Sequence, residues 1–186
     1  MATNRGLIGA AGEYALASEL SRRGWLATVT LKNSPDIDVL ARRAESRHLV
    51  AIQVKTVSPG RKAFQLKTSQ EVVEREPNEP DEWMAFVRFK EENERASFHL
   101  VPTKMVAAVL YAVRRDAETR GKKVGPWRNF LTEWVDDFAE AWDALSRPAL
   151  EVGIRPRKDV LEMIARFGRP EDQAVIAGRV WPQAAS

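Results

Sequence analysis

Cysteine is absent from the 186 residues of the chain, and so are long apolar runs. Without cysteine the protein can form neither disulfide bonds nor thiolate metal sites, which fits a reducing compartment such as the cytoplasm. No apolar stretch approaches the roughly 20 residues that a membrane-spanning helix needs. The N-terminal stretch also lacks the apolar core of a signal peptide, since Glu13 interrupts it early. We therefore expect a cytoplasmic protein with no membrane partner.

The motifs of several large enzyme classes are missing as well. The chain has no Walker A phosphate loop, no Gly-x-Ser-x-Gly, no His-Glu-x-x-His and no Rossmann glycine fingerprint. Its only histidines, His48 and His99, lie in segments with the pattern of strands, where a structural role is the more common one. Carboxylates and lysines remain as the residues that could carry chemistry.

The composition is that of a folded globular domain, with 44% hydrophobic and 30% charged residues. The net charge of +3 conceals an uneven distribution. Residues 42–67 carry seven bases and one acid, residues 71–94 carry three bases and nine acids, and residues 104–128 carry seven bases and two acids. Basic segments of this kind suit a polyanion such as nucleic acid, although the solvated faces of ordinary elements would show the same pattern.

Hydrophobic periodicity predicts an α/β fold followed by a helical extension. We expect a helix, three short strands, a short helix, two further strands, a second long helix and an amphipathic segment whose aromatic residues, spaced by three and four, belong to the core. In this order the expected ranges are 6–23, 25–31, 36–42, 49–56, 69–75, 83–90, 96–101, a helix opening at 102–103, and 127–145. After a linker at 147–156, residues 157–167 and 171–179 have the pattern of two short helices. The chain is accordingly divided into a domain at 1–146 and a C-terminal helical extension at 147–186.

Polar side chains interrupt two of the expected strands on one face. Asp36 and Asp38 alternate with apolar neighbours in the second strand, and Gln53 and Lys55 do so in the third. A lysine inside an otherwise apolar strand needs a partner, because burying an unpaired ammonium is costly. Antiparallel strands joined by a short turn would bring Asp38 and Lys55 together. Glu13 lies on a stretch of small residues in the first helix, which can approach the same sheet closely.

Such a cluster suits phosphodiester hydrolysis. Carboxylate oxygens bind a hard cation such as Mg²⁺, which polarises a phosphate and activates a water. A lysine beside them can stabilise the negative charge that develops in the reaction. The structural alternative is a buried salt bridge between Lys55 and Asp38 that serves only to satisfy the strand.

The order and spacing of these residues resemble the PD-(D/E)XK nuclease superfamily, in particular its Holliday-junction resolvases and a small bacterial family of nuclease-like proteins. The resemblance lies in three segments, Gly9-x-x-Gly12-Glu13, Pro35–Ala41 and Val50–Thr56. It implies a restriction-endonuclease-like core, in which a central mixed β-sheet is flanked by helices, here with the C-terminal helical extension added.

The resemblance also implies roles for individual residues. Glu13 would be the carboxylate of the helix, Asp38 the central metal ligand, Gln53 the second acidic position and Lys55 the catalytic lysine. Asp36 matches the Asp of the "PD" string, but the strand register favours Asp38. The implied cofactor is Mg²⁺ or Mn²⁺, with Glu13, Asp36, Asp38 and Gln53 as candidate ligands. Gln53 departs from the family pattern, because an amide oxygen can ligate a cation but brings no charge.

The function implied is Mg²⁺-dependent endonucleolytic cleavage of DNA. Candidate phosphate-binding residues are the bases that flank the site in sequence: Arg42, Arg43, Arg61, Lys62 and Lys67. Two alternatives stay open. One is a catalytically inactive nuclease-fold module that binds nucleic acid or a protein partner, and the other is a structural protein whose polar cluster only specifies the fold. DNA is the expected partner, and a homodimer is compatible with the sequence.

Overall fold

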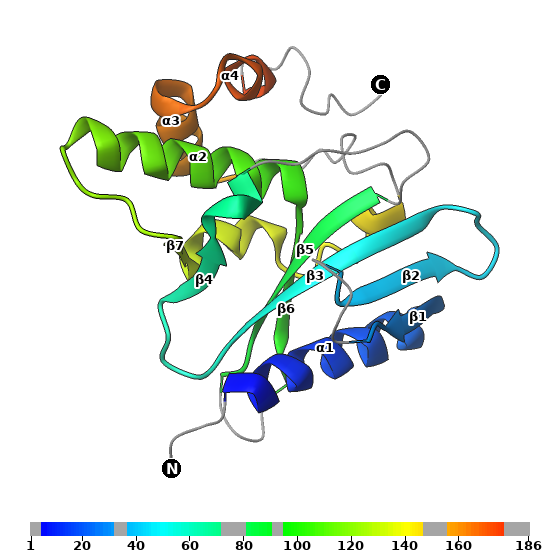
Figure 1. Ribbon diagram of the computed structural model, residues 1–186. Coiled ribbons are helices and arrows are strands. Elements are labelled where there is room, and N and C mark those ends of the chain that lie inside the picture. The colour runs from blue at the N-terminus through cyan, green and yellow to red at the C-terminus, as the bar shows by residue number, and fades with distance from the viewer. Residues whose placement is uncertain (1–4, 32–36, 72–80, 91–94, 147–155, 177–186) are drawn as a thin grey trace.

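The protein is described from a computed structural model, which covers residues 5–31, 37–71, 81–90, 95–146 and 156–176. Its centre is a five-stranded sheet with the strand order β1–β2–β3–β5–β6 (Figure 1). These strands are β1 (Trp25–Val29), β2 (Val39–Arg43), β3 (Leu49–Val57), β5 (Asp81–Arg88) and β6 (Ser97–Pro102). Neighbouring strands are antiparallel except β3 and β5, which are parallel. The mixed sheet predicted from the sequence is confirmed.

Helices cover both faces of this sheet, α1 (Arg5–Arg22) on one side and α2 (Thr103–Thr119) on the other (Figure 1). Alternate residues of a strand point to opposite faces, so each face has its own apolar core. Ile52 of β3 packs on the α1 side with Leu16, whereas Phe86 of β5 packs on the α2 side. The core has the element order expected from the sequence: a helix, three antiparallel strands, a strand parallel to the third and a second long helix.

The contact between α1 and β3 is very close at Gly12. A β-carbon added to Gly12 would lie 1.9 Å from Oγ1 of Thr56 and 3.0 Å from its Cβ. These distances leave no room for a side chain, so α1 can lie this near the sheet only because residue 12 is a glycine. One turn earlier, a β-carbon on Gly9 would meet nothing within 4 Å. The close approach fixes where α1 crosses β3, and with it the position of Glu13.

A second, two-stranded sheet was not predicted. It pairs β4 (Ala63–Lys67), which follows β3, with β7 (Trp127–Leu131) in antiparallel register. The prediction of a single segment with helical spacing at 127–145 is wrong, because this stretch begins as β7 and continues as the 3₁₀ helices η2 (Thr132–Phe138) and η3 (Trp142–Ser146). Phe130, Phe138 and Trp142 of this stretch are buried in the core, as expected.

The C-terminal extension contains α3 (Lys158–Phe167) and α4 (Pro170–Ile176), close to the two predicted helices. Val160 of α3 packs into the α2-side core, and Arg169 donates a hydrogen bond to the backbone carbonyl of Glu71 at 3.0 Å. The described part of the extension therefore shares a core with the sheet, and the domain boundary at residue 146 stays a prediction. Of the expected helix at 69–75, the described part is the 3₁₀ helix η1 (Thr68–Glu71). Across the described residues, none of the helices has the length and apolar character to cross a membrane.

His99 of β6 is a buried polar residue with a full set of partners. Its Nε2 lies 3.0 Å from Nε of Arg88, and its Nδ1 lies 3.0 Å from the carbonyl oxygen of Val135. Since arginine can only donate, Nε2 accepts, and Nδ1 carries the proton that the carbonyl of Val135 accepts. Burial, reinforced by the charge of Arg88, lowers the pKa of His99 from 6.5 to about 4. The neutral ring thus has the structural role expected from the sequence.

Substitution of Gly12 by alanine should destabilise the protein by about 1–3 kcal/mol, because the added methyl group forces α1 away from β3. The matched control is Gly9→Ala, which should be neutral or stabilising by up to about 1 kcal/mol, since alanine favours the helix and its β-carbon meets no neighbour. Thr56→Ala in the Gly12→Ala background should recover part of the loss. Urea unfolding measures all three, and equal stability of the two single glycine variants would show that α1 does not pack this closely.

Protein stability should fall as the pH drops from about 6.5 towards 4 because of His99. The unfolded chain takes up a proton at an ordinary pKa of 6.5, whereas the folded chain resists protonation down to about 4. The stability is therefore complete above pH 6.5, and about 3 kcal/mol of it is lost across this window. Urea unfolding between pH 4 and pH 6.5 should show a flatter pH dependence for His99→Gln than for wild type. An unchanged slope in His99→Gln would contradict the assignment.

Candidate functional site

β2 and β3 bring three of the predicted site residues to one face of the sheet. Their register pairs Val39 with Ile52, and continuing it by one residue sets Asp38, which directly precedes β2, opposite Gln53. Residues directly opposite in an antiparallel pair point to the same face, and Lys55 shares that face because it is two residues further along β3. Gln53 and Lys55 thus share one face of β3 and Asp38 lies beside them, while the site that the three would form stays a prediction.

This face is the one turned towards α2. In the parallel register of β3 and β5, Gln53 and Lys55 lie beside Met84 and Phe86, which pack against α2. Asp38, Gln53 and Lys55 are each half-buried, whereas Met84 and Phe86 are fully buried. The three polar side chains thus lie where the core meets the solvent, and the strands that carry them are held by apolar packing.

Asp38 is fixed by hydrogen bonds from both of its neighbouring strands. Its carboxylate oxygen Oδ2 accepts the backbone N–H of Val54 at 2.7 Å, and its own N–H donates to the carbonyl of Ile52 at 3.0 Å. On the other side, its carbonyl accepts the N–H of Thr30 at 2.9 Å. The carboxylate therefore completes the β2–β3 ladder where β2 begins. Because one oxygen is fixed, the orientation of the second oxygen is set as well.

Gln53 is linked to the second sheet through a single side chain. Its side-chain oxygen Oε1 accepts a hydrogen bond from the side-chain amide of Gln70 in η1. The other end of the same amide, Oε1 of Gln70, accepts the backbone N–H of Lys67 at 3.0 Å. One glutamine side chain thus separates the candidate site from the end of β4.

Glu13 reaches the region from the other side of the sheet. It lies on α1, which covers the face opposite to Gln53 and Lys55, and it follows Gly12, which touches Thr56. The α1 backbone at Glu13 is therefore adjacent to the strand residue that follows Lys55. The role of Glu13 as a ligand or catalytic carboxylate stays a prediction. Asp36 lies outside the described residues.

The donor atoms on this face suit a hard cation. Asp38 offers a carboxylate and Gln53 an amide oxygen, and both are ligand types that Mg²⁺ and Mn²⁺ accept. Within residues 5–31, 37–71, 81–90, 95–146 and 156–176, no three Asp, Glu, His or Cys side chains gather as a metal-binding group. An ion held by Asp38 and Gln53 would therefore need waters or phosphate oxygens for its remaining positions, as Mg²⁺ commonly does.

The predicted phosphate-binding residues separate into two groups. Arg42 and Arg43 lie at the end of β2 opposite to Asp38, about 13–17 Å along the strand. Arg42 donates to the carbonyl of Ser46 at 3.2 Å, and Arg43 donates to Ser146 at 3.0 Å, so both have structural partners. The second group, Arg61, Lys62 and Lys67, is exposed in and beside β4. Lys67 of this second group is linked to Gln53 through the side chain of Gln70.

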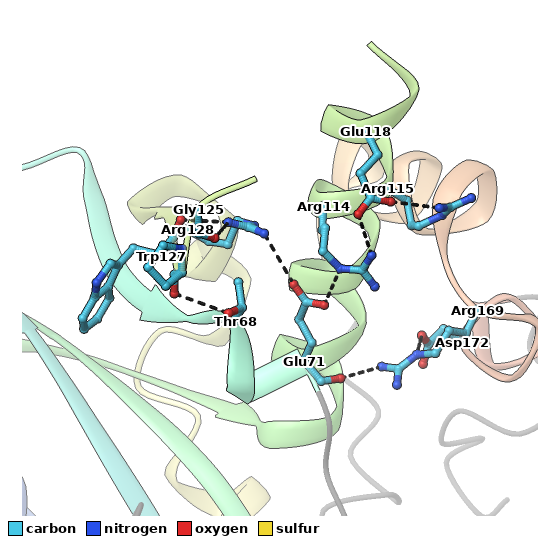
Figure 2. Close-up of polar contacts among 11 residues, drawn as sticks. Thr68, Glu71, Arg114, Arg115, Glu118, Gly125, Trp127, Arg128, Arg169 and Asp172 are labelled. Atoms are coloured by element: carbon cyan, nitrogen blue, oxygen red, sulfur yellow. Dashed lines mark hydrogen bonds and ion pairs between the residues drawn. The ribbon is translucent and has the colours of Figure 1, made fainter. Parts of the chain in front are cut away.

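A buried ionic cluster around Glu71 was not predicted (Figure 2). Glu71 is 7% exposed and accepts a hydrogen bond from Nε of Arg114 at 2.7 Å, while Nη2 of Arg128, 8% exposed, lies 3.9 Å from its second oxygen. Hydrogen bonds to Glu71 and Glu118 hold the pKa of Arg114 above its usual range. Arg169 joins through the backbone carbonyl of Glu71. The cluster connects η1, α2, β7 and the segment before α4, which lie far apart in the sequence.

The sequence offered no signal for this cluster, because Glu71 opens an acid-rich stretch and its partners stand more than forty residues away. A buried charge is tolerated only when it is paired, and the carboxylate of Glu71 meets that condition with Arg114 and Arg128 beside it. Its position beneath β7 makes it a structural support for the two-stranded sheet.

The solved structures that match this chain include a resolvase and a homing endonuclease. No family model and no curated protein matches the chain. The Holliday junction resolvase Hjc of Archaeoglobus fulgidus is 23% identical, with 52% of this chain and 78% of that chain covered and a TM-score of 0.36. The bacterial homing endonuclease I-Ssp6803I is 18% identical, with 78% of this chain and 94% of that chain covered and a TM-score of 0.43. Likenesses of this strength do not establish a function, which has to come from the residues of the chain itself.

The hydrogen bond from Val54 to Asp38 predicts that two substitutions of Asp38 differ in stability. Asp38→Ala leaves the partly buried N–H of Val54 without its acceptor and should cost about 1–3 kcal/mol. Asp38→Asn keeps an oxygen acceptor and should stay within about 1 kcal/mol of wild type. Urea unfolding monitored by circular dichroism makes the comparison, and equal stability of the two variants would contradict a structural role for this carboxylate.

Proposed function

We propose that the protein is a metal-dependent endonuclease that cleaves phosphodiester bonds in DNA. One observation supports the proposal: Oδ2 of Asp38 accepts the backbone N–H of Val54, the residue that lies between Gln53 and Lys55 on β3. In this arrangement two oxygen ligands could hold a metal ion beside a phosphate group while the ammonium binds the same phosphate. The order of these residues in the chain, with Glu13 before them, is the order of the PD-(D/E)XK resemblance.

Asp38 and Gln53 would hold a Mg²⁺ or Mn²⁺ ion, which when bound supplies Lewis-acid polarisation of the phosphate and a water of lowered pKa. Lys55 donates to a phosphate oxygen and stabilises the negative charge that grows there in the transition state. The N–H of Val54 holds the Asp38 carboxylate in one orientation, so little ordering remains to be done when the substrate binds.

One observation favours a second candidate function, that of a catalytically inactive module that binds nucleic acid. Gln53 brings no charge to the cation, and its carbonyl oxygen already accepts the amide of Gln70. A site with one carboxylate on this face would bind a divalent cation more weakly than a site with two. In that case the exposed bases Arg61, Lys62 and Lys67 would bind nucleic acid that the protein does not cleave.

Asp38→Asn and Lys55→Met should each lower Mg²⁺-dependent nicking of plasmid and branched DNA by about 100-fold or more, since each removes an interaction made with the transition state. The matched control is Lys158→Met, which removes an ammonium from an exposed position on α3 and should leave the rate unchanged. Rates are measured in Mg²⁺ and in Mn²⁺ with EDTA as a blank. Residual cleavage at the wild-type rate in Asp38→Asn would point to a contaminating nuclease and to the inactive module.

Gln53→Glu should tighten divalent-cation binding and keep or raise the cleavage rate. The substitution adds a negative ligand and leaves an acceptor for the amide of Gln70. Calorimetric titration with Mg²⁺ and Mn²⁺ measures the binding directly, without reference to activity. Unchanged cation affinity in Gln53→Glu would show that Gln53 does not lie at a metal site.

A further inference from the structure

The outer face of the two-stranded sheet, formed by β4 and β7, has an unusual set of exposed side chains. The register pairs Gln65 with Asn129 and Lys67 with Trp127, and all four side chains are exposed. The amides of Gln65 and Asn129 form a hydrogen bond with each other across the strands. We call this surface, with the exposed bases Arg61 and Lys62 that directly precede β4, the ribbon face.

The ribbon face is held rigidly from below. Phe64 and Phe130, on the inner side of the two strands, pack against Phe86 of β5 with ring centroids 4.8 and 5.1 Å apart. Arg128, also on the inner side, belongs to the buried cluster with Glu71. The exposed side chains therefore stand on a backbone that is fixed by both apolar and ionic contacts, and little ordering is needed when a ligand binds.

The charge of this region is of one sign. Residues 61–67 and 121–131 contain no Asp or Glu, and Lys122 and Lys123 are exposed on the segment that leads into β7. Glu71 is buried and paired with Arg114 and Arg128. The ribbon face is thus complementary in charge to a phosphodiester backbone.

The indole of Trp127 is the feature that decides what kind of nucleic acid fits. Trp127 is 53% exposed, whereas Trp25, Trp83 and Trp142 are at most 6% exposed. Its ring points away from the Glu71 cluster (Figure 2), and the ammonium of Lys67 lies 5.9 Å from the ring centroid. An exposed indole among cations is the arrangement on which nucleic acid bases stack, and stacking requires a base whose face is open. Bases within a duplex are already stacked on their neighbours.

We infer that the ribbon face binds a single-stranded segment of the DNA substrate, with an unpaired base stacked on Trp127 and phosphates held by Lys67, Arg61 and Lys62. This inference rests on the proposed function, which it deepens by naming the substrate class. The path from Lys67 through Gln70 to Gln53 places the ribbon face directly beside the candidate site. A strand held on β4 and β7 would therefore be led to the face that carries Asp38 and Lys55.

The test measures binding apart from cleavage. Every protein carries Asp38→Asn and is assayed in EDTA, with a labelled oligothymidylate of about 15 nucleotides and a duplex of the same length as probes. Trp127→Ala should weaken binding of the single strand by about 5–100-fold and leave duplex binding within about twofold, since only the single strand offers an open base. The matched control is Tyr14→Ala, which removes an exposed aromatic side chain, 66% exposed, from α1 and should change neither affinity.

Two further measurements support the same comparison. Binding of the single strand should quench tryptophan fluorescence in the parent protein and not in Trp127→Phe, which isolates the signal of this residue. Arg61→Ala/Lys62→Ala should reduce the salt dependence of single-strand binding by up to about 1.4 in the log–log slope, at about 0.7 for each phosphate that the variant no longer neutralises. Thermal unfolding verifies that each variant is folded.

The inference is overturned if Trp127→Ala binds the oligothymidylate as tightly as its parent, or if it weakens the duplex as much as the single strand. The second result would mean that the ribbon face contacts the backbone or groove of a duplex. Failure of the proposed function would give a different result. The wild-type protein would not cleave DNA in Mg²⁺ or Mn²⁺, while single-strand binding would still depend on Trp127.

Discussion

The antiparallel register of β2 and β3 is the constraint on which the candidate site depends. A shift of one residue would turn every side chain of one strand to the opposite face and separate Asp38 from Gln53 and Lys55. Two features hold the register. The apolar residues of both strands must face α1, and the carboxylate of Asp38 accepts the N–H of Val54, so a residue of the site is also part of the ladder that aligns it.

The position of α1 depends on the absence of a side chain at residue 12. Gly12 lets the helix lie against Thr56, on the face opposite to Lys55. Glu13 therefore directly follows the helix residue that touches β3, and Gln53 and Lys55 lie on the opposite face of that strand. A helix held further away by an alanine would move Glu13 relative to both strands.

Charged residues serve three different purposes in this fold. Around Glu71 they are buried, paired and structural, and they tie the two-stranded sheet to α2 and to the C-terminal helices. On the face of Asp38 and Lys55 they are half-buried, which allows them to be both positioned and accessible. On the ribbon face they are exposed and of one sign, as binding to a polyanion requires.

The sequence alone determined the sheet strands that carry the site, because strict alternation of apolar and polar residues is a local signal that shows which side chains share a face. It also determined the order of helix and strands, and the face of β3 that Gln53 and Lys55 share. It could not determine β7, since the aromatic residues of 127–145 recur at helical spacing and only pairing with β4, about sixty residues away, makes the first part a strand. The Glu71 cluster and the separation of Arg42 and Arg43 from the second basic group were likewise decided by tertiary structure. Contacts between residues distant in the chain depend on how the layers pack, and no local pattern records that.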